Sequence, residues 1–131
     1  MVSKKRLRIL KDFLNELDDK NFNFGFYISK YDPEHSCNTV ACAVGWCPTV
    51  FPKHWKVSIN LYPVLVSMEK GLWAEIMLSA IKFFRLNKSQ FNHLFVPGLQ
   101  NHRYGGEFLD HNATPKQVAS NIEAFLESTK S

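Results

Sequence analysis

The chain contains 131 residues, of which 45% are hydrophobic and 21% are charged, and its formal net charge is +4. A globular chain of this length buries roughly two-thirds of the surface that its unfolded form exposes, so neither disulfides nor metals are needed for folding. The apolar runs are all shorter than the roughly 20 residues needed to cross a bilayer, which excludes a transmembrane span.

The sequence predicts one domain over residues 1–131, in which a basic amphipathic helix at 1–19 precedes a helical core at 20–131. The N-terminus lacks the apolar segment of a signal peptide. The cysteines number three, and an odd number argues against a disulfide framework. We therefore expect a cytoplasmic protein with reduced thiols, in the cytoplasm of the host cell if the protein is viral.

The first segment combines an apolar stripe with a concentration of positive charge. Leucines recur at spacings of three and four, as on a buried helix face, at Leu7, Leu10, Leu14 and Leu17. Five cations precede the first acid, namely Lys4, Lys5, Arg6, Arg8 and Lys11. The helix dipole disfavours cations in the first turns of a helix. These five residues are candidates for salt-dependent phosphate contact, with a solvated helix face as the favoured interpretation.

Two segments leave strand and loop open as alternatives. Residues 22–31 alternate aromatic with polar positions, as an extended segment with one buried face does. Residues 57–67 fit either a strand or a loop that crosses the core. Between these segments, residues 38–46 are predicted to form a short buried helix. We expect Pro48 to end that helix, because proline has no N–H for a further helical bond.

The turn after Pro48 is expected to carry Phe51 and Trp55 inward. Beyond it, residues 71–86 are predicted to be helical. The stripe that we expect to be buried there contains Trp73, Met77, Ala80 or Ile81, and Phe84.

Two later helices have clear start signals. Asn87 and Gln90 have the spacing of a capping box for a helix over 88–95, which Pro97 and Gly98 end. The last helix starts with threonine at the cap, proline at the first position and glutamine at the third, at Thr114, Pro115 and Gln117. Its predicted buried stripe contains Val118, Ile122, Phe125 and Leu126.

These patterns predict a mostly α-helical fold, with a single compact helical domain of four to five helices and room for one short strand or hairpin. Eleven phenylalanines, three tryptophans and four tyrosines indicate an aromatic core.

All three cysteines lie between positions 37 and 47, which raises the question of a metal site or a nucleophile. With His35 and His54 they form a pattern too widely spaced for the paired ligands of structural zinc. On a helix, Cys37 and Cys42 would also lie about 140° apart around the axis. We therefore predict no metal and no cofactor.

Cys37 is the only candidate catalytic residue. It lies where the predicted helix would begin, and a helix N-terminus lowers the pKa of a thiol. A general base would have to come from another element, and the candidates are His93, His102 and His111. A cysteine-dependent enzyme is therefore the alternative to a non-catalytic protein.

The favoured interpretation of the cysteine segment is interior packing. Cysteine is among the residue types most often buried, and it packs well beside alanine, glycine and tryptophan. The predicted structural core motif contains Cys37, Thr39, Cys42, Gly45 and Trp46.

The spacing of this motif resembles a group of small uncharacterised bacteriophage and bacterial proteins with a C-G-T-x-A-C-x-x-G-W core. Further pieces of the resemblance are Phe83-Phe84-Arg85-Leu86, Leu94-Phe95-Val96-Pro97 and Thr114-Pro115. The likeness covers roughly residues 22 to 127, and it departs at Asn38 and Arg85, where the group has glycine. It implies a phage-like setting and no particular chemistry.

The polar loop over residues 101–114 is a second candidate binding segment. Gly-Gly lies there beside His102, Arg103 and Tyr104, and such a loop can cradle a phosphate. No phosphate-loop or dinucleotide fingerprint accompanies it, so an ordinary surface loop is the favoured interpretation.

The sequence thus favours a non-catalytic, phage-type accessory or inhibitor protein that binds a host macromolecule or a small signalling ligand. A Cys37–histidine enzyme and a nucleic-acid binder acting through the basic N-terminal helix are the alternatives. The sequence identifies neither the partner nor the oligomeric state.

Overall fold

The computed structural model describes residues 2–18, 43–59, 62–70, 74–110 and 112–129. Within these ranges five α-helices and one two-stranded antiparallel hairpin share a single hydrophobic core. The predicted mostly α-helical fold with an aromatic core is therefore confirmed. None of the described helices combines the length and the apolar content that a membrane span demands.

The element bounds follow the chain. The α-helices are α1 (Lys4–Glu16), α2 (Cys47–Val50), α3 (Ala74–Phe84), α4 (Lys88–Phe95) and α5 (Pro115–Ser128). The hairpin consists of β1 (Trp55–Val57) and β2 (Pro63–Leu65), and two short 3-10 helices are η3 (Val44–Trp46) and η4 (His102–Tyr104). The predicted extended segment at 22–31 lies outside the described residues, as do Cys37, Thr39 and Cys42.

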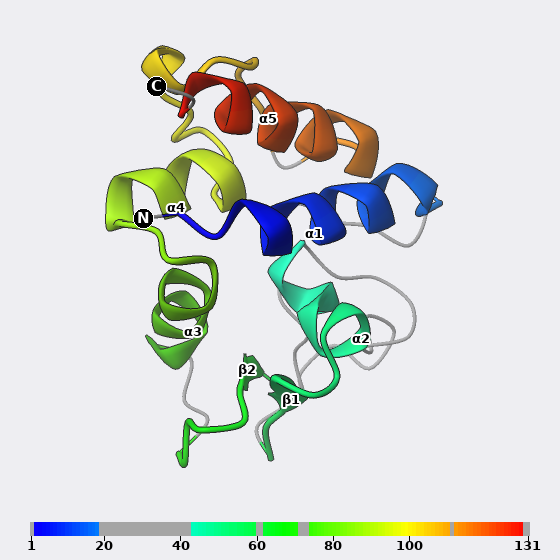
Figure 1. Ribbon diagram of the computed structural model, residues 1–131, viewed down its shortest axis with the longest axis vertical. Coiled ribbons are helices and arrows are strands. Elements are labelled where there is room, and N and C mark those ends of the chain that lie inside the picture. Colours follow the sequence, from blue (N-terminus) through cyan, green and yellow to red (C-terminus); the bar gives the residue numbers. More distant parts are fainter. Residues whose placement is uncertain (1, 19–42, 60–61, 71–73, 111, 130–131) are drawn as a thin grey trace.

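Helix α1 occupies the middle of the structure (Figure 1). Helix α5 lies against it and runs in the opposite direction, while the hairpin lies at the far end of the molecule, next to α2 and α3. Three of the four predicted leucines, Leu7, Leu10 and Leu14, are fully buried, whereas Leu17 is only half-buried. The helix ends at Glu16.

The predicted role of Pro48 is wrong. Helix α2 begins at Cys47 and contains Pro48 in its first turn, directly after η3. Proline is tolerated there because the N–H groups of a first turn have no partner inside the helix. The chain therefore continues in a helical path through the proline, and Phe51 closes the helix by donating its N–H to the Cys47 carbonyl at 2.7 Å.

The ambiguous segment at 57–67 contributes to the hairpin. Trp55 pairs with Leu65 and Val57 with Pro63. The N–H of Leu65 donates to the buried Ser79 hydroxyl at 3.0 Å, which fixes β2 against α3. As predicted, Phe51 and Trp55 are buried.

Both predicted capping boxes are present. In α4 the Gln90 N–H donates to the Asn87 side chain at 2.8 Å, and the Asn87 N–H donates back to Gln90 at 2.9 Å. In α5 the Thr114–Gln117 pair makes the same two bonds at 3.2 and 2.8 Å. The predicted buried residues of α5, Val118, Ile122, Phe125 and Leu126, are all buried.

The predicted stripe of α3 is only partly correct. Ala80 and Phe84 are buried, whereas Met77 and Ile81 are half-buried. The most buried face also includes Ile76 and Phe83, and Trp73 lies outside the described residues. The face is wider than predicted because α3 packs against the hairpin as well as against α1 and α4.

Helix α3 ends at a residue in the left-handed region. Arg85 has φ 58°, and the N–H of Leu86 donates to the Ile81 carbonyl at 3.0 Å, as in a Schellman cap. Glycine usually occupies this position, because a side chain in the left-handed region costs about 1 kcal/mol.

The first turn of α1 docks on this end of α3. The Ser3 N–H donates to the Phe84 carbonyl at 2.9 Å, although the Ser3 side chain makes no cap bond. Nη1 of Arg6 donates to the Phe83 carbonyl at 2.9 Å, and the guanidinium carbon lies 4.1 Å from the centroid of the Phe83 ring. These contacts join the N-terminus of one helix to the C-terminus of the other.

We expect Arg6→Ala to lower the free energy of unfolding by about 1–2 kcal/mol, because it removes a hydrogen bond from a charged donor and a contact with an aromatic ring. The matched control is Arg8→Ala, an exposed arginine on the same helix, which should change stability by less than about 0.5 kcal/mol. Urea denaturation measures both, and equal effects of the two substitutions would contradict the prediction.

Candidate functional site

The described part of the cysteine segment is interior. Gly45, Trp46 and Cys47 are buried, and the Cys47 sulfur lies 3.8 Å from the Ala43 carbonyl oxygen. The Trp46 ring packs on Phe13 of α1 with a centroid separation of 5.6 Å. This segment therefore fastens η3 and α2 to α1.

Within the described ranges, His, Cys, Asp and Glu side chains nowhere gather in a group of three that would hold a metal ion. His35, Cys37 and Cys42 of the considered zinc pattern lie outside those ranges, so the structure does not place them.

The candidate bases for Cys37 differ in their surroundings. His93 is fully buried in α4, where its ring packs on Tyr104 at 5.1 Å and on Phe125 at 6.3 Å. Its Nδ1 accepts the Asn101 N–H at 2.8 Å, and burial lowers its pKa. His93 therefore holds the loop that contains Asn101 and Tyr104 against α4 and α5. His102 is exposed, and His111 lies outside the described residues.

The predicted binding loop is packed on α5. Tyr104 is buried, and its hydroxyl accepts a hydrogen bond from Arg103 at 2.7 Å. The buried Asn121 side chain accepts the Glu107 N–H and donates to the Glu107 carbonyl, both at 2.8 Å. Gly106, with φ 79°, lies against Asn121. The Gly-Gly turn thus faces a protein side chain, and only His102 and Arg103 of the three candidates are exposed.

The five N-terminal cations do not form one uniform surface. Arg6 caps α3, and Lys11 pairs with Glu123 of α5 at 2.9 Å. The bond with Glu123 raises the pKa of Lys11. Lys5 and Arg8 are exposed, and Lys4 is half-buried. Two of the five cations therefore hold α1 against its neighbouring helices.

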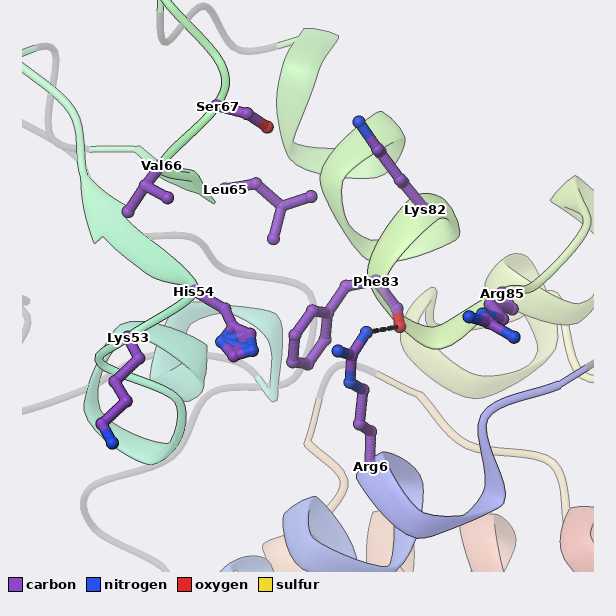
Figure 2. A pocket seen from close by; sticks show the side chains of 9 residues that line it. All are labelled: Arg6, Lys53, His54, Leu65, Val66, Ser67, Lys82, Phe83 and Arg85. Atoms are coloured by element: carbon purple, nitrogen blue, oxygen red, sulfur yellow. Dashed lines mark hydrogen bonds between the residues drawn. The ribbon is translucent and has the colours of Figure 1, made fainter.

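An open pocket of about 540 Å³ lies where the first turn of α1, the turn before β1, the turn after β2 and the end of α3 meet. Nine residues line this cationic pocket, and they are Arg6, Lys53, His54, Leu65, Val66, Ser67, Lys82, Phe83 and Arg85. Figure 2 shows Lys53 at one end and Arg85 at the other, with His54, Phe83 and Arg6 between them.

The pocket has a fixed apolar floor. The Phe83 ring makes edge contacts with Phe51 at 4.7 Å, Trp55 at 5.6 Å and His54 at 5.4 Å. Leu65 is also buried. His54 and the three cations other than the half-buried Arg6 are exposed to solvent. A ligand would therefore meet a buried aromatic base and solvent-exposed charged side chains.

The electrostatic field of the pocket is positive. Its lining includes four permanent cations and, among the described residues, no carboxylate. The last carbonyls of α3 would oppose an anion, but three of them already accept hydrogen bonds: Ile81 from Leu86, Phe83 from Arg6 and Phe84 from Ser3. The cations are therefore opposed by little negative potential from the helix terminus.

Sequence reasoning found only Arg6 of these cations. Lys53, Lys82 and Arg85 were missed because they are scattered along the chain, and only the docking of α1 and the hairpin on α3 brings them together. The available signal was weak: Lys82 and Arg85 are three residues apart at the end of a predicted helix, and a continuous helix would place them on neighbouring parts of one face.

We expect Gly106→Ala to lower the free energy of unfolding by about 2–3 kcal/mol. The added methyl group would displace Asn121 from its two buried hydrogen bonds, in addition to the strain of a positive φ. Gly98→Ala is the matched control, because Gly98 has φ 81° and open space around it. It should cost only about 1 kcal/mol. Equal losses in thermal denaturation would show that the Asn121 contact is unimportant.

The buried His93 makes stability depend on pH. Its pKa is lowered from the ordinary value of 6.5, so the unfolded chain binds a proton more readily than the native protein. The contribution of neutral His93 to the free energy of unfolding is therefore fully present above about pH 6.5. It falls as the pH drops below that value, with a slope of at most about 1.4 kcal/mol per pH unit. Denaturation between pH 7.5 and 5.5 measures this slope. His93→Gln should flatten it, whereas His102→Gln, an exposed position, should leave it unchanged.

Comparison of the chain with protein-family models, with curated proteins and with solved structures finds no match. The assignment of a site therefore depends on this chain's own residues, and the cationic pocket is the candidate that they define best.

Proposed function

We propose that the protein is a non-catalytic binding protein whose cationic pocket recognises a small phosphate-bearing ligand. The single observation that supports this proposal is the convergence of four cations from three separate segments around one pocket whose described lining contains no carboxylate. Like charges brought together repel one another, and an anion in the pocket relieves that repulsion.

Phosphate fits this pocket better than a single carboxylate does. A phosphomonoester carries about −1.5 to −2 charges at neutral pH and offers three acceptor oxygens. Arginine binds such a group through two parallel N–H donors, and lysine binds it as a point charge. Arg85 and Lys82, which both line the pocket, provide one of each kind.

A small ligand is favoured over a nucleic acid. The pocket volume of about 540 Å³ falls within the range of roughly 300–1,000 Å³ that is typical of small-molecule sites. The N-terminal helix offers no continuous basic stripe to a phosphate backbone, since Arg6 and Lys11 are held by Phe83 and Glu123.

The proposed setting is that of a phage-type accessory or inhibitor protein in the cytoplasm of the host cell, where binding would sequester or sense a small phosphorylated signalling ligand. The resemblance of the cysteine segment to small phage proteins supports this setting. The Cys37-dependent enzyme stays a prediction, because Cys37 lies outside the described residues.

The test is calorimetric titration of the full chain with inorganic tripolyphosphate and with adenosine triphosphate. We expect both to bind, and affinity to fall as salt rises from about 50 mM to about 300 mM, because exposed charges are screened. Neutralising two rim lysines in the double variant Lys53→Gln/Lys82→Gln should weaken binding about tenfold, since each exposed contact contributes up to about 1 kcal/mol.

The control is Lys88→Gln/Lys116→Gln, which removes two exposed lysines outside the pocket and the same net charge. It should bind as the wild type does. Equal weakening in both double variants would show that only net charge matters and would contradict a site at the pocket. Tighter binding of a single-stranded oligonucleotide than of either triphosphate would instead favour a nucleic-acid binder.

A further inference from the structure

We infer that Arg85 is the anchor that binds the terminal phosphate group of the ligand, and that the end of helix α3 is less stable than it would otherwise be because an arginine occupies this position. The inference rests on the proposed function of the cationic pocket. It identifies the residue that recognises the ligand, and it narrows the class of ligand to molecules with a terminal phosphate.

The two arginines of the pocket are not equivalent. Arg6 donates to the Phe83 carbonyl and lies over the Phe83 ring, so its guanidinium is already engaged in holding α1 on α3. Arg85 is exposed, and its side chain makes no hydrogen bond or ion pair with any residue that the structure describes. Its five N–H donors are therefore available to a bidentate acceptor.

The backbone at Arg85 points to the same role. The residue has φ 58°, a conformation that favours glycine, and the cap at this position depends only on main-chain atoms, because the Leu86 N–H bonds to the Ile81 carbonyl. The guanidinium of Arg85 therefore makes no contribution to the cap, and a glycine at this position could form the same cap bond. A strained residue whose side chain borders a pocket is a common feature of binding sites.

The surroundings of Arg85 define the ligand further. Lys82, in the last turn of α3, also lines the pocket and supplies a second cation. Lys53 lies at the opposite end, beyond His54 and Phe83 (Figure 2). An extended ligand with a terminal phosphate at Arg85 and a second anionic group toward Lys53 matches this distribution. Linear polyphosphates and nucleoside polyphosphates share that chemistry.

The test compares Arg85→Gly and Arg85→Lys with the wild type, in the full chain, by thermal denaturation and by titration with inorganic tripolyphosphate. We expect Arg85→Gly to raise Tm, because glycine relieves the left-handed backbone, and to raise Kd about tenfold or more, because the charged donor is lost. Arg85→Lys should give an intermediate Kd, since lysine keeps the charge without the planar pair of donors. A higher Tm excludes misfolding as the cause of weaker binding.

The matched control is Arg8→Gln, which removes an exposed arginine that does not line the pocket and should leave Kd unchanged. Wild-type affinity in Arg85→Gly, together with weakened binding in Lys53→Gln/Lys82→Gln, would overturn the role of Arg85 and keep the proposed function. A lower Tm in Arg85→Gly would show that the arginine stabilises the helix end. That result would contradict the inference that Arg85 makes the end of α3 less stable. No binding of tripolyphosphate by the wild type would reject the proposed function itself, and this inference with it.

Discussion

The fold and the candidate site both depend on the junction between the first turn of α1 and the last turn of α3. Helix termini leave backbone N–H and C=O groups without partners inside the helix, and here the two termini satisfy one another. The Ser3 N–H and the Arg6 guanidinium each donate to a carbonyl of α3 at 2.9 Å. A cation at the N-terminus of its own helix is unfavourable, but Arg6 acts at the C-terminus of the other helix, where positive charge is favourable. The junction also fixes Phe83, the centre of the pocket floor.

Much of the fold could be predicted from local patterns. The leucine spacing of α1 and the capping boxes at Asn87 and Thr114 depend on residues within one or two turns, and the structure agrees with each of them. The interpretation of Pro48 failed because proline has opposite effects in the interior and in the first turn of a helix, and the sequence does not show which applies. The hairpin was left open because three-residue strands are too short for a period to be visible.

The candidate site was much harder to predict than the fold. A dense local cluster, the cysteine segment, attracted attention, yet its described members are packing residues. The pocket instead gathers cations from three segments that are far apart in sequence, around Arg6, Lys53 and Arg85, and each of these cations alone resembles an ordinary surface charge. The positive φ of Arg85 has no signature in the sequence, because a helix that ends before Leu86 is compatible with many residues at that position. Such a site becomes visible only when the tertiary structure is known.

The pairing of α1 with α5 has a consequence for how the chain is made. Helix α1 packs against α5, and Lys11 reaches Glu123 across 112 positions of sequence. Synthesis proceeds from the N-terminus, so α1 leaves the ribosome well before its partner exists. Until α5 has been made, the apolar stripe of α1 can associate with other chains. Closing so long a loop is also slow compared with forming a local turn. The cations distributed around α1 would keep the nascent helix soluble during that interval.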